Sequence, residues 1–412
     1  MTRNTRAPEG RRHSPPARRL PTTLLLLLLA LALPGAGALA QKKKEPRKLF
    51  PIDGERGGTA FIDRAGRVRI PPGGVDFTDA VKGGKYHLPR PPSRWNVEGD
   101  KEYSGHRRRV RVGEFSEGRA QFSINTRPGS RALHLAHGFI DETGKVVIPP
   151  TYTRRVGDFR DGRALVTDDR GKRGYIDRDG KSVIPPVYQY TWGFSEGLAA
   201  ASLDGKKFGY IDREGRVAIP LEFAGTQHFS EGLAQVALAE GRMGYIDRAG
   251  RVVFRLREGE YGEEFREGLA MFRVGGYYGK RGFIDRRGRV VIPAEFDDAR
   301  DFSEGKALVK RGDSWGFIDR AGKFVIPPVY AYGSSFSEGL AAVTVARERM
   351  QAGWGYIDHA GNVRIPLEFD YAAPFSGGLA AIDRTVDGNP LGVDAYIDAH
   401  GRVVWEKPAR GR

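Results

Sequence analysis

Hydrophobic positions along this chain come in short runs that are separated by Gly, Pro and charged residues. The segment W-G-F-I-D-R-A-G-K-F-V-I-P-P-V-Y, Trp315 to Tyr330, contains two such runs on either side of D-R-A-G. Short runs rich in β-branched and aromatic residues, bounded by turn residues, are typical of β-strands. The pattern therefore predicts hairpins of short strands rather than long helices.

Close copies of this segment recur along most of the chain, at intervals of about 35 to 40 residues. The first repeated motif is an aromatic residue followed by Ile-Asp. Its nine copies begin at Phe61, Phe139, Tyr175, Tyr210, Tyr245, Phe283, Phe317, Tyr356 and Tyr396. The second motif is F-S-E-G or a variant of it. Its eight copies begin at Phe115, Phe159, Phe194, Phe229, Phe265, Phe302, Phe336 and Phe375.

Each unit is expected to contain three strands, namely G-Y-I-D, R-V-V-I-P and L-A-x-V. Proline cannot donate a ladder hydrogen bond, so the second strand is expected to end there. From Asp141 onward, the step from the Asp to the next motif Phe is 17 or 18 residues, whereas the return step varies from 17 to 23. One arm of the unit therefore has a fixed length and the other carries insertions.

The repeated Asp has the sequence context of a turn residue. In I-D-R-A-G-K, Asp and Gly take the first and fourth positions of a type I turn, where each is preferred. The Asp side chain can accept a hydrogen bond from a nearby backbone N–H, and a Gly with positive φ can close a bulged hairpin. The pattern predicts a structural role for Asp63, Asp141, Asp177, Asp212, Asp247, Asp285, Asp319, Asp358 and Asp398.

The Glu of F-S-E-G precedes a Gly, which favours a second tight turn or an interstrand hydrogen bond. The alternative is a row of carboxylates that binds cations or a cationic peptide. Glu occurs at 117, 196, 231, 267, 304 and 338, and two copies carry Asp161 or Gly377 instead.

These motifs resemble the WG-repeat family, also called KWG repeats, over roughly residues 58 to 406. Trp315-Gly316 and Trp354-Gly355 retain the Trp-Gly step before aromatic-Ile-Asp. We call the position before this Gly the Trp slot. In other copies it holds Arg173, Phe208, Met243 or Arg281. The resemblance implies an interaction or cell-envelope-binding module, and it implies no general catalytic activity.

The expected fold is all-β, a tandem array of short hairpins. Such units build either a solenoid or a β-propeller. The last unit looks complete and the N-terminus adds a further hairpin, Ala60 to Ile70, so neither end lacks a strand that the other supplies. This favours an open, solenoid-like array, with an eight-bladed propeller as the alternative.

The repeat domain is expected at residues 58–406, between a basic linker at 41–57 and a C-terminal tail at 407–412. One gap departs from the repeat, because Phe115 follows Asp63 by 52 residues. Segment 71–110 within it is interpreted as a degenerate repeat or an ordered insertion, since an unstructured loop of this length is unusual in a compact domain.

Residues 1–40 have the pattern of an export signal. Arg residues precede the apolar stretch Leu24 to Leu33, and Ala38-Leu39-Ala40 fits a cleavage site before Gln41. The alternative is an uncleaved anchor, for which the apolar stretch is short. We expect an exported protein, periplasmic or extracellular, with no membrane span after cleavage.

The net charge is +16, and removal of residues 1–40, which hold six Arg and one Glu, would leave about +11. For an exported chain, the expected partners are a protein or an anionic cell-envelope polymer, and no nucleic acid. The alternative is a solvated Arg-rich surface without a specific partner.

No motif predicts a catalytic, cofactor or metal site. The chain has no Cys, which removes disulfides and thiolate ligands. His134 and His137 have no apparent third ligand. The ligand-binding candidates are aromatic residues, Trp315 and Trp354 in the Trp slot and Tyr188 and Tyr330 after P-P-V, although such residues can equally fill a core.

The sequence therefore predicts an exported, non-catalytic repeat scaffold that binds a protein or an envelope polymer. The alternative is a hydrolase-like enzyme whose site lies in the non-repetitive segments 71–110 or 127–137, because single-copy chemistry is expected where the repeat is broken.

Overall fold

The computed structural model describes residues 48–53, 59–71, 111–125, 135–238, 241–276, 278–345, 353–384 and 394–407. The expected signal at 1–40, residues 72–110 of the insertion and the tail from residue 408 lie outside these residues. In the described part of the chain, the strands form nine small antiparallel sheets. We number these sheets 1 to 9 along the chain.

Sheets 1 to 3 contain β1 (Phe50–Asp53), β2 (Thr59–Ile62) and β3 (Val68–Ile70); β4 (Arg111–Ser116), β5 (Arg119–Asn125), β6 (Leu135–Asp141) and β7 (Val146–Tyr152); and β8 (Ala164–Thr167), β9 (Arg173–Ile176) and β10 (Ser182–Tyr188). Sheets 4 to 6 contain β11 (Tyr190–Thr191), β12 (Leu198–Ser202), β13 (Phe208–Asp212) and β14 (Val217–Phe223); β15 (Gly225–Thr226), β16 (Leu233–Ala237), β17 (Met243–Asp247) and β18 (Val252–Arg255); and β19 (Glu260–Arg266), β20 (Leu269–Val274), β21 (Lys280–Asp285) and β22 (Val290–Phe296). Sheets 7 to 9 contain β23 (Asp298–Ala299), β24 (Ala307–Arg311), β25 (Ser314–Ile318) and β26 (Phe324–Tyr330); β27 (Tyr332–Gly333), β28 (Ala341–Thr344), β29 (Trp354–Ile357) and β30 (Val363–Phe369); and β31 (Tyr371–Ala372), β32 (Ala380–Asp383), β33 (Ala395–Ile397) and β34 (Val403–Glu406).

Most sheets have one strand more than the sequence predicts. Seven of the nine described sheets have four strands, in chain order. The additional strand is the first one, and in five sheets it is only two residues long. Such a short strand, for example β11, follows the P-x-x-[YF] segment directly and has no periodicity of its own, so the sequence pattern did not indicate it.

The expectation that Pro ends the V-I-P strand was wrong. Strand β10 runs from Ser182 to Tyr188 and includes Pro185 and Pro186. It is the last strand of its sheet and pairs only with β9, with register shifts between Ile184 and Tyr188. Proline is tolerated at this place because an edge strand has no second neighbour to which it must donate.

The middle strands of each sheet are buried on both faces. All five residues of β12 are buried, whereas the edge strand β14 alternates between buried and exposed positions. A strand buried on both faces must pack against other layers on either side. The sheets therefore pack face to face, each between two neighbours.

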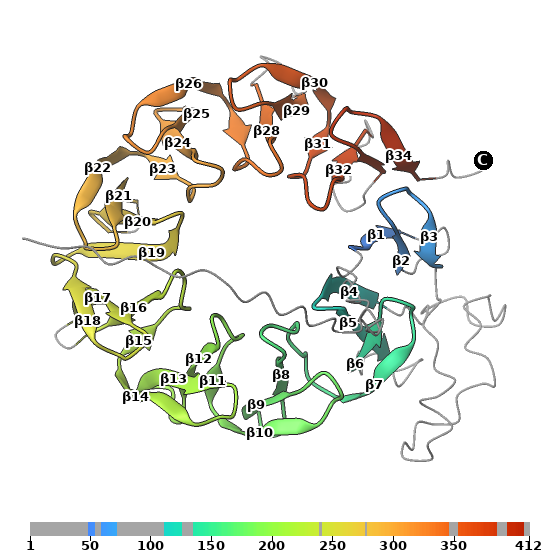
Figure 1. Cartoon of the computed structure of the whole chain (residues 1–412), viewed down its shortest axis with the longest axis vertical. Helices are drawn as coiled ribbons and strands as arrows, with labels where there is room; N and C mark the ends of the chain where they lie inside the picture. The colour runs from blue at the N-terminus through green and yellow to red at the C-terminus, as the bar shows by residue number, and fades with distance from the viewer. Residues whose placement is uncertain are drawn as a thin grey trace, which may run out of the picture. The chain divides into compact units, whose positions relative to one another are not determined.

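The sheets form a closed ring rather than an open array (Figure 1). Nine hydrophobic clusters occupy the nine junctions between consecutive sheets, and the ninth joins sheet 9 to sheet 1. The expected open solenoid was wrong, and so was the alternative of eight blades. The fold is a nine-bladed β-propeller, in which the N-terminal hairpin forms a blade of its own.

Side chains, not a shared strand, close this ring. The ring of Phe50 lies 5.5 Å from that of Tyr396, whose hydroxyl donates to the carbonyl of Pro51 at 2.8 Å. Lys48 donates to the hydroxyl of Ser376. Because Phe50 is buried against sheet 9, β1 belongs to the domain, which corrects the expectation of a linker over 41–57.

One aromatic pair recurs at every junction. The aromatic residue of the aromatic-Ile-Asp motif packs on the F-S-E-G Phe of the next sheet, mostly edge to face. The eight pairs are Phe61–Phe115, Phe139–Phe159, Tyr175–Phe194, Tyr210–Phe229, Tyr245–Phe265, Phe283–Phe302, Phe317–Phe336 and Tyr356–Phe375, with centroids 4.7 to 5.2 Å apart. At the ninth junction, Phe50 takes the place of the motif Phe.

The predicted role of the repeated Asp is confirmed. In the copy at Asp247, the backbone carbonyl accepts from Gly250, and Oδ1 accepts the N–H groups of Ala249 and Arg251. Gly250 has a φ of 79°, as a bulged hairpin requires. Burial tends to raise the pKa of Asp247, but the Arg251 guanidinium and these N–H groups outweigh it and hold the pKa below its usual value.

We expect Phe50→Ala to lower the free energy of unfolding as much as Phe194→Ala does, by about 3–5 kcal/mol. Both side chains are buried in aromatic pairs, one at the closing junction and one inside the array. Urea unfolding of the two variants compares them. In an open array Phe50 would lie at a free end, so a negligible loss for Phe50→Ala beside a large loss for Phe194→Ala would contradict closure.

Candidate functional site

The two ends of each sheet carry different features. Leu198 pairs with Asp212, so the F-S-E-G turn and the Asp turn lie at the same end of sheet 4. Phe208 in the Trp slot pairs with Phe223 at the other end. The same register recurs in the other sheets, so the ring has one face of turns and one face of Trp slots. We call them the turn face and the slot face.

The F-S-E-G turn is a two-residue hairpin connection with an unusual backbone. Ser195 and Leu198 exchange both backbone hydrogen bonds, and Glu196 and Gly197 have φ of 53° and 78°. The left-handed region is disfavoured for a residue such as Glu and costs roughly 1–2 kcal/mol. The same positive φ occurs at Glu117, Asp161, Glu231, Glu267, Glu304 and Glu338.

The carboxylates of these turns bond the next sheet rather than their own. Glu231 Oε2 accepts the N–H of Gly268 at 2.8 Å. The equivalent acceptors and donors are Glu117 and Gly162, Asp161 and Gly197, Glu196 and Gly232, Glu267 and Gly305, Glu304 and Gly339, and Glu338 and Gly378. The tight turn predicted at F-S-E-G is thus confirmed. The hydrogen bond of its carboxylate joins two sheets. We call this contact the inter-sheet carboxylate bond.

Serine and arginine side chains reinforce the same contact. The hydroxyl of Ser195 donates to the carbonyl of Phe229 in the next sheet at 2.7 Å. Arg178, the second residue of the Asp177 turn, lies 2.8 Å from Glu117 of the preceding sheet. Burial tends to raise the pKa of Glu117, but the Arg178 guanidinium and the N–H of Gly162 outweigh this effect. The pKa of Glu117 therefore lies below its usual value.

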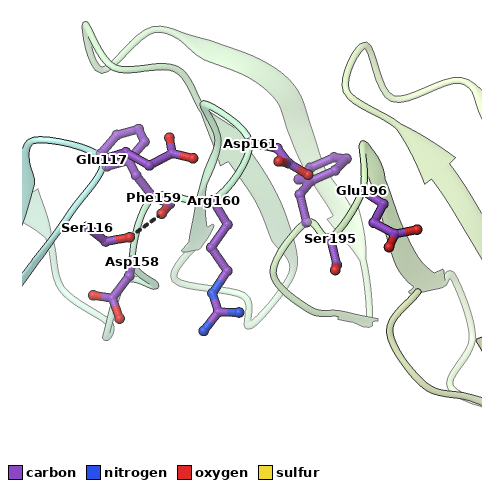
Figure 2. Close-up of a pocket in the computed structure, with 9 residues that line it drawn as sticks. Ser116, Glu117, Asp158, Phe159, Arg160, Asp161, Ser195 and Glu196 are labelled. Carbon is purple, nitrogen blue, oxygen red and sulfur yellow. Dashed lines mark hydrogen bonds between the residues drawn. The ribbon is translucent and has the colours of Figure 1, made fainter. Parts of the chain in front are cut away.

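A shallow polar hollow of about 380 Å³ lies over the turns of sheets 2 to 4 (Figure 2). Figure 2 shows Arg160 extending to the side of Asp158, away from Glu117 and Asp161. The hydroxyls of Ser116 and Ser195 both donate to backbone carbonyls. The serines and turn carboxylates of this hollow therefore hold neighbouring sheets together. Within the described residues, no cluster of three His or acidic side chains is placed to hold a metal ion.

On the slot face, the Trp-slot residue of one sheet contacts a residue of the next sheet. That residue lies four positions before the Phe of the next F-S-E-G motif. Arg173 lies over the ring of Tyr190 at 5.3 Å, and the rings of Trp354 and Tyr371 are 5.8 Å apart. Arg281 pairs with Asp298 at 3.2 Å. At these junctions the slot is thus a contact between sheets.

The structure places three of the four ligand candidates in the cores between sheets. Tyr188, Trp315 and Tyr330 are each less than a tenth exposed and belong to junction clusters. Trp354 is half-buried beside Tyr371. Trp315 and Tyr330 share one junction, but Tyr188 and Trp354 each belong to another. The four side chains therefore do not converge on a common cavity.

Sequence reasoning missed the aromatic residues that the slot face exposes. Tyr190, Tyr261, Tyr332 and Tyr371 occupy the same position of four sheets and are 39 to 61% exposed. Each lies four residues before a motif Phe, so the spacing could have identified them. They lie in a region where the copies differ most in sequence, which is why no repeated motif pointed to them.

The model of the WG containing repeat matches seven segments, residues 138–171, 174–206, 208–238, 243–278, 282–314, 315–345 and 354–383, which together cover more than half of the chain. The chain belongs to the WG-repeat family. The matched segments begin just before the aromatic-Ile-Asp motif of sheet 2 and end after the F-S-E-G variant of sheet 9, so the motifs at Phe115 and Tyr396 and the closing sheet 1 lie outside them. A search of curated proteins finds no match to this WG-repeat chain.

One of the solved structures that resemble this WG-repeat chain supports its fold. A structure described as a crystal structure of the eukaryotic initiation factor has a TM-score of 0.55 and 13% identity, covering 88% of this chain and 96% of its own. BamB from Moraxella catarrhalis has a TM-score of 0.38 and 12% identity, covering 66% and 92% respectively, which is too low to support an inference. No helix in the described residues is long and apolar enough to cross a membrane.

We expect Glu231→Ala to destabilise the protein more than Glu231→Gly, by about 1–2 kcal/mol. Both variants lose the inter-sheet carboxylate bond, but only glycine adopts the left-handed backbone without strain. Gly377 occupies this position in the last copy, with a φ of 68°. Denaturant unfolding measures the difference, and equal stability of the two variants would contradict the strained turn.

Proposed function

We propose that this WG-repeat protein is an exported, non-catalytic scaffold that binds an anionic cell-envelope polymer across the slot face. The observation that carries the proposal is the recurrence of exposed tyrosines at one position of sheets 4, 6, 8 and 9. An array of equivalent side chains suits a polymer with a repeating unit, because each unit can make the same contact.

The distribution of polar groups supports a binding role. The Asp, Glu and Ser residues of the repeated motifs hold turns or join sheets. Two of the exposed tyrosines have positive neighbours, since Arg173 and Arg273 lie over Tyr190 and Tyr261 at 5.3 and 5.1 Å. The full chain has a net charge of +16, and about +11 remains without residues 1–40, so the exported protein attracts anionic partners in preference to cationic ones.

Purified protein incubated with peptidoglycan sacculi tests this proposal. We expect retention that falls at high salt, because exposed charge pairs are screened. A variant with serine at Tyr190, Tyr261, Tyr332 and Tyr371 should be retained at least tenfold less. The matched control replaces exposed residues of the outer edge strands, Val217, Val329 and Val363, with serine and should be retained like the unmodified protein. Retention of the unmodified protein no better than that of an unrelated basic protein would contradict the proposal.

Export is the second part of the proposal and rests on the pattern of residues 1–40. Expression of the full chain, followed by cell fractionation and N-terminal sequencing, tests it. We expect a product outside the cytoplasm that begins at Gln41. A full-length product confined to the cytoplasm would contradict export.

A further inference from the structure

One junction of the slot face lacks the usual partner of the Trp slot. From sheet 2 to sheet 9, the residue opposite the slot is Arg155, Tyr190, Gly225, Tyr261, Asp298, Tyr332 or Tyr371. At the junction of sheets 4 and 5, where β13 contacts β15, the slot residue is Phe208 and the residue opposite is Gly225. The side chain that contacts the slot residue at the junctions of Arg173, Arg281 and Trp354 is therefore missing here.

Two other aromatic rings lie against Phe208 instead. Tyr190 and Trp192 project from the same sheet, with ring centroids 6.4 and 5.7 Å from that of Phe208. Ser202 pairs with Tyr190 and lies on β12, the strand between β11 and β13. Its side chain is small enough to let the rings of Tyr190 and Phe208 approach each other. Tyr190 is 39% and Trp192 36% exposed, so the three rings form an accessible aromatic surface. We call Tyr190, Trp192 and Phe208 the aromatic cluster.

Cations surround the aromatic cluster. Arg173 lies over Tyr190, and Lys206 and Lys207 are exposed on the turn that follows β12. Gly205 of this turn packs directly against the Tyr190 ring, since an added Cβ would lie 2.8 Å from its Cε2. Asp204 is the one carboxylate of the turn, and it accepts the backbone N–H groups of Lys206 and Lys207.

We infer that the aromatic cluster binds a sugar ring of an anionic glycan. Planar aromatic faces stack on the apolar C–H face of a sugar, while the wet edges of Tyr and Trp leave its hydroxyls solvated. Arg173 and Lys206 supply the complementary charge for carboxylates of the same polymer. The inference rests on the proposed polymer-binding function and assigns it a site and a ligand class.

Gly225 permits a blocking substitution that leaves the fold intact. Its backbone has an ordinary φ, and an added Cβ would make one ordinary contact, at 3.7 Å from the Cβ of Ala237. Gly225→Tyr restores the pairing that Trp354 and Tyr371 make at another junction. The aromatic cluster would then be covered from the side of sheet 5.

Calorimetric titration of the mature chain with oligogalacturonate tests the site. We expect Trp192→Ala and Gly225→Tyr to weaken binding at least tenfold with unchanged thermal unfolding. Val217→Ala is the matched control, because Val217 is exposed on β14 of the same sheet and is not one of the exposed tyrosines, and it should change affinity less than twofold. A neutral oligosaccharide, maltohexaose, should bind at least tenfold more weakly than oligogalacturonate.

Three results would overturn the inference. Polyglutamate binding as tightly as oligogalacturonate, with the same loss in Trp192→Ala, would make the ligand an acidic peptide. Unchanged affinity of Gly225→Tyr would place the glycan elsewhere, and absence of any oligogalacturonate binding would remove the ligand class. If the protein is still retained on sacculi, all three results leave the proposed function standing. Failure of the glycan site is therefore distinguishable from failure of polymer binding as a whole.

Discussion

The fold depends on one aromatic pair that is repeated at each junction between sheets. Each sheet is too small to bury its own faces, so stability comes from packing against two neighbours. Tyr210 and Phe229, 4.7 Å apart, bring an aromatic strand residue of one sheet onto the turn of the next. This contact explains the fixed step of 17 or 18 residues, because the turn, edge strand and crossover between the two motifs must place the Phe on that ring. The hairpin on the slot face has no such constraint and accepts insertions.

Around this pair, the polar residues of the repeat join the sheets rather than form a chemical site. Glu231 has a strained backbone, and its carboxylate accepts a hydrogen bond from the next sheet. The hydroxyls of Ser230 and Tyr245 donate to the backbone carbonyls of Phe265 and Glu263 in that sheet. Burial raises the pKa of Tyr245, so its hydroxyl stays protonated and can donate. A repeat that uses its polar side chains in this way leaves the variable positions of the slot face available for recognition.

Local structure was predictable from the sequence, because Asp and Gly at fixed spacing define a turn through their own backbone preferences. Closure was not, since it depends on the angle between neighbouring sheets, which no residue pattern encodes. Closure also uses Phe50 and Lys48, which lie outside every repeat motif. The candidate site was missed for a related reason. Trp315 belongs to the repeated motif but is buried. Gly225 leaves the aromatic cluster accessible because it has no side chain, and no motif indicates that.

The closed ring is tested most directly by a distance between its first and last sheets. The chain has no Cys, so spin labels can be placed specifically at Arg67→Cys and Val403→Cys. Both positions are exposed, and their neighbours Gly66 and Val404 are in direct contact. Electron–electron dipolar spectroscopy should give a single short distance between the labels. Labels separated by the length of the array, with no short-distance population, would contradict the ring.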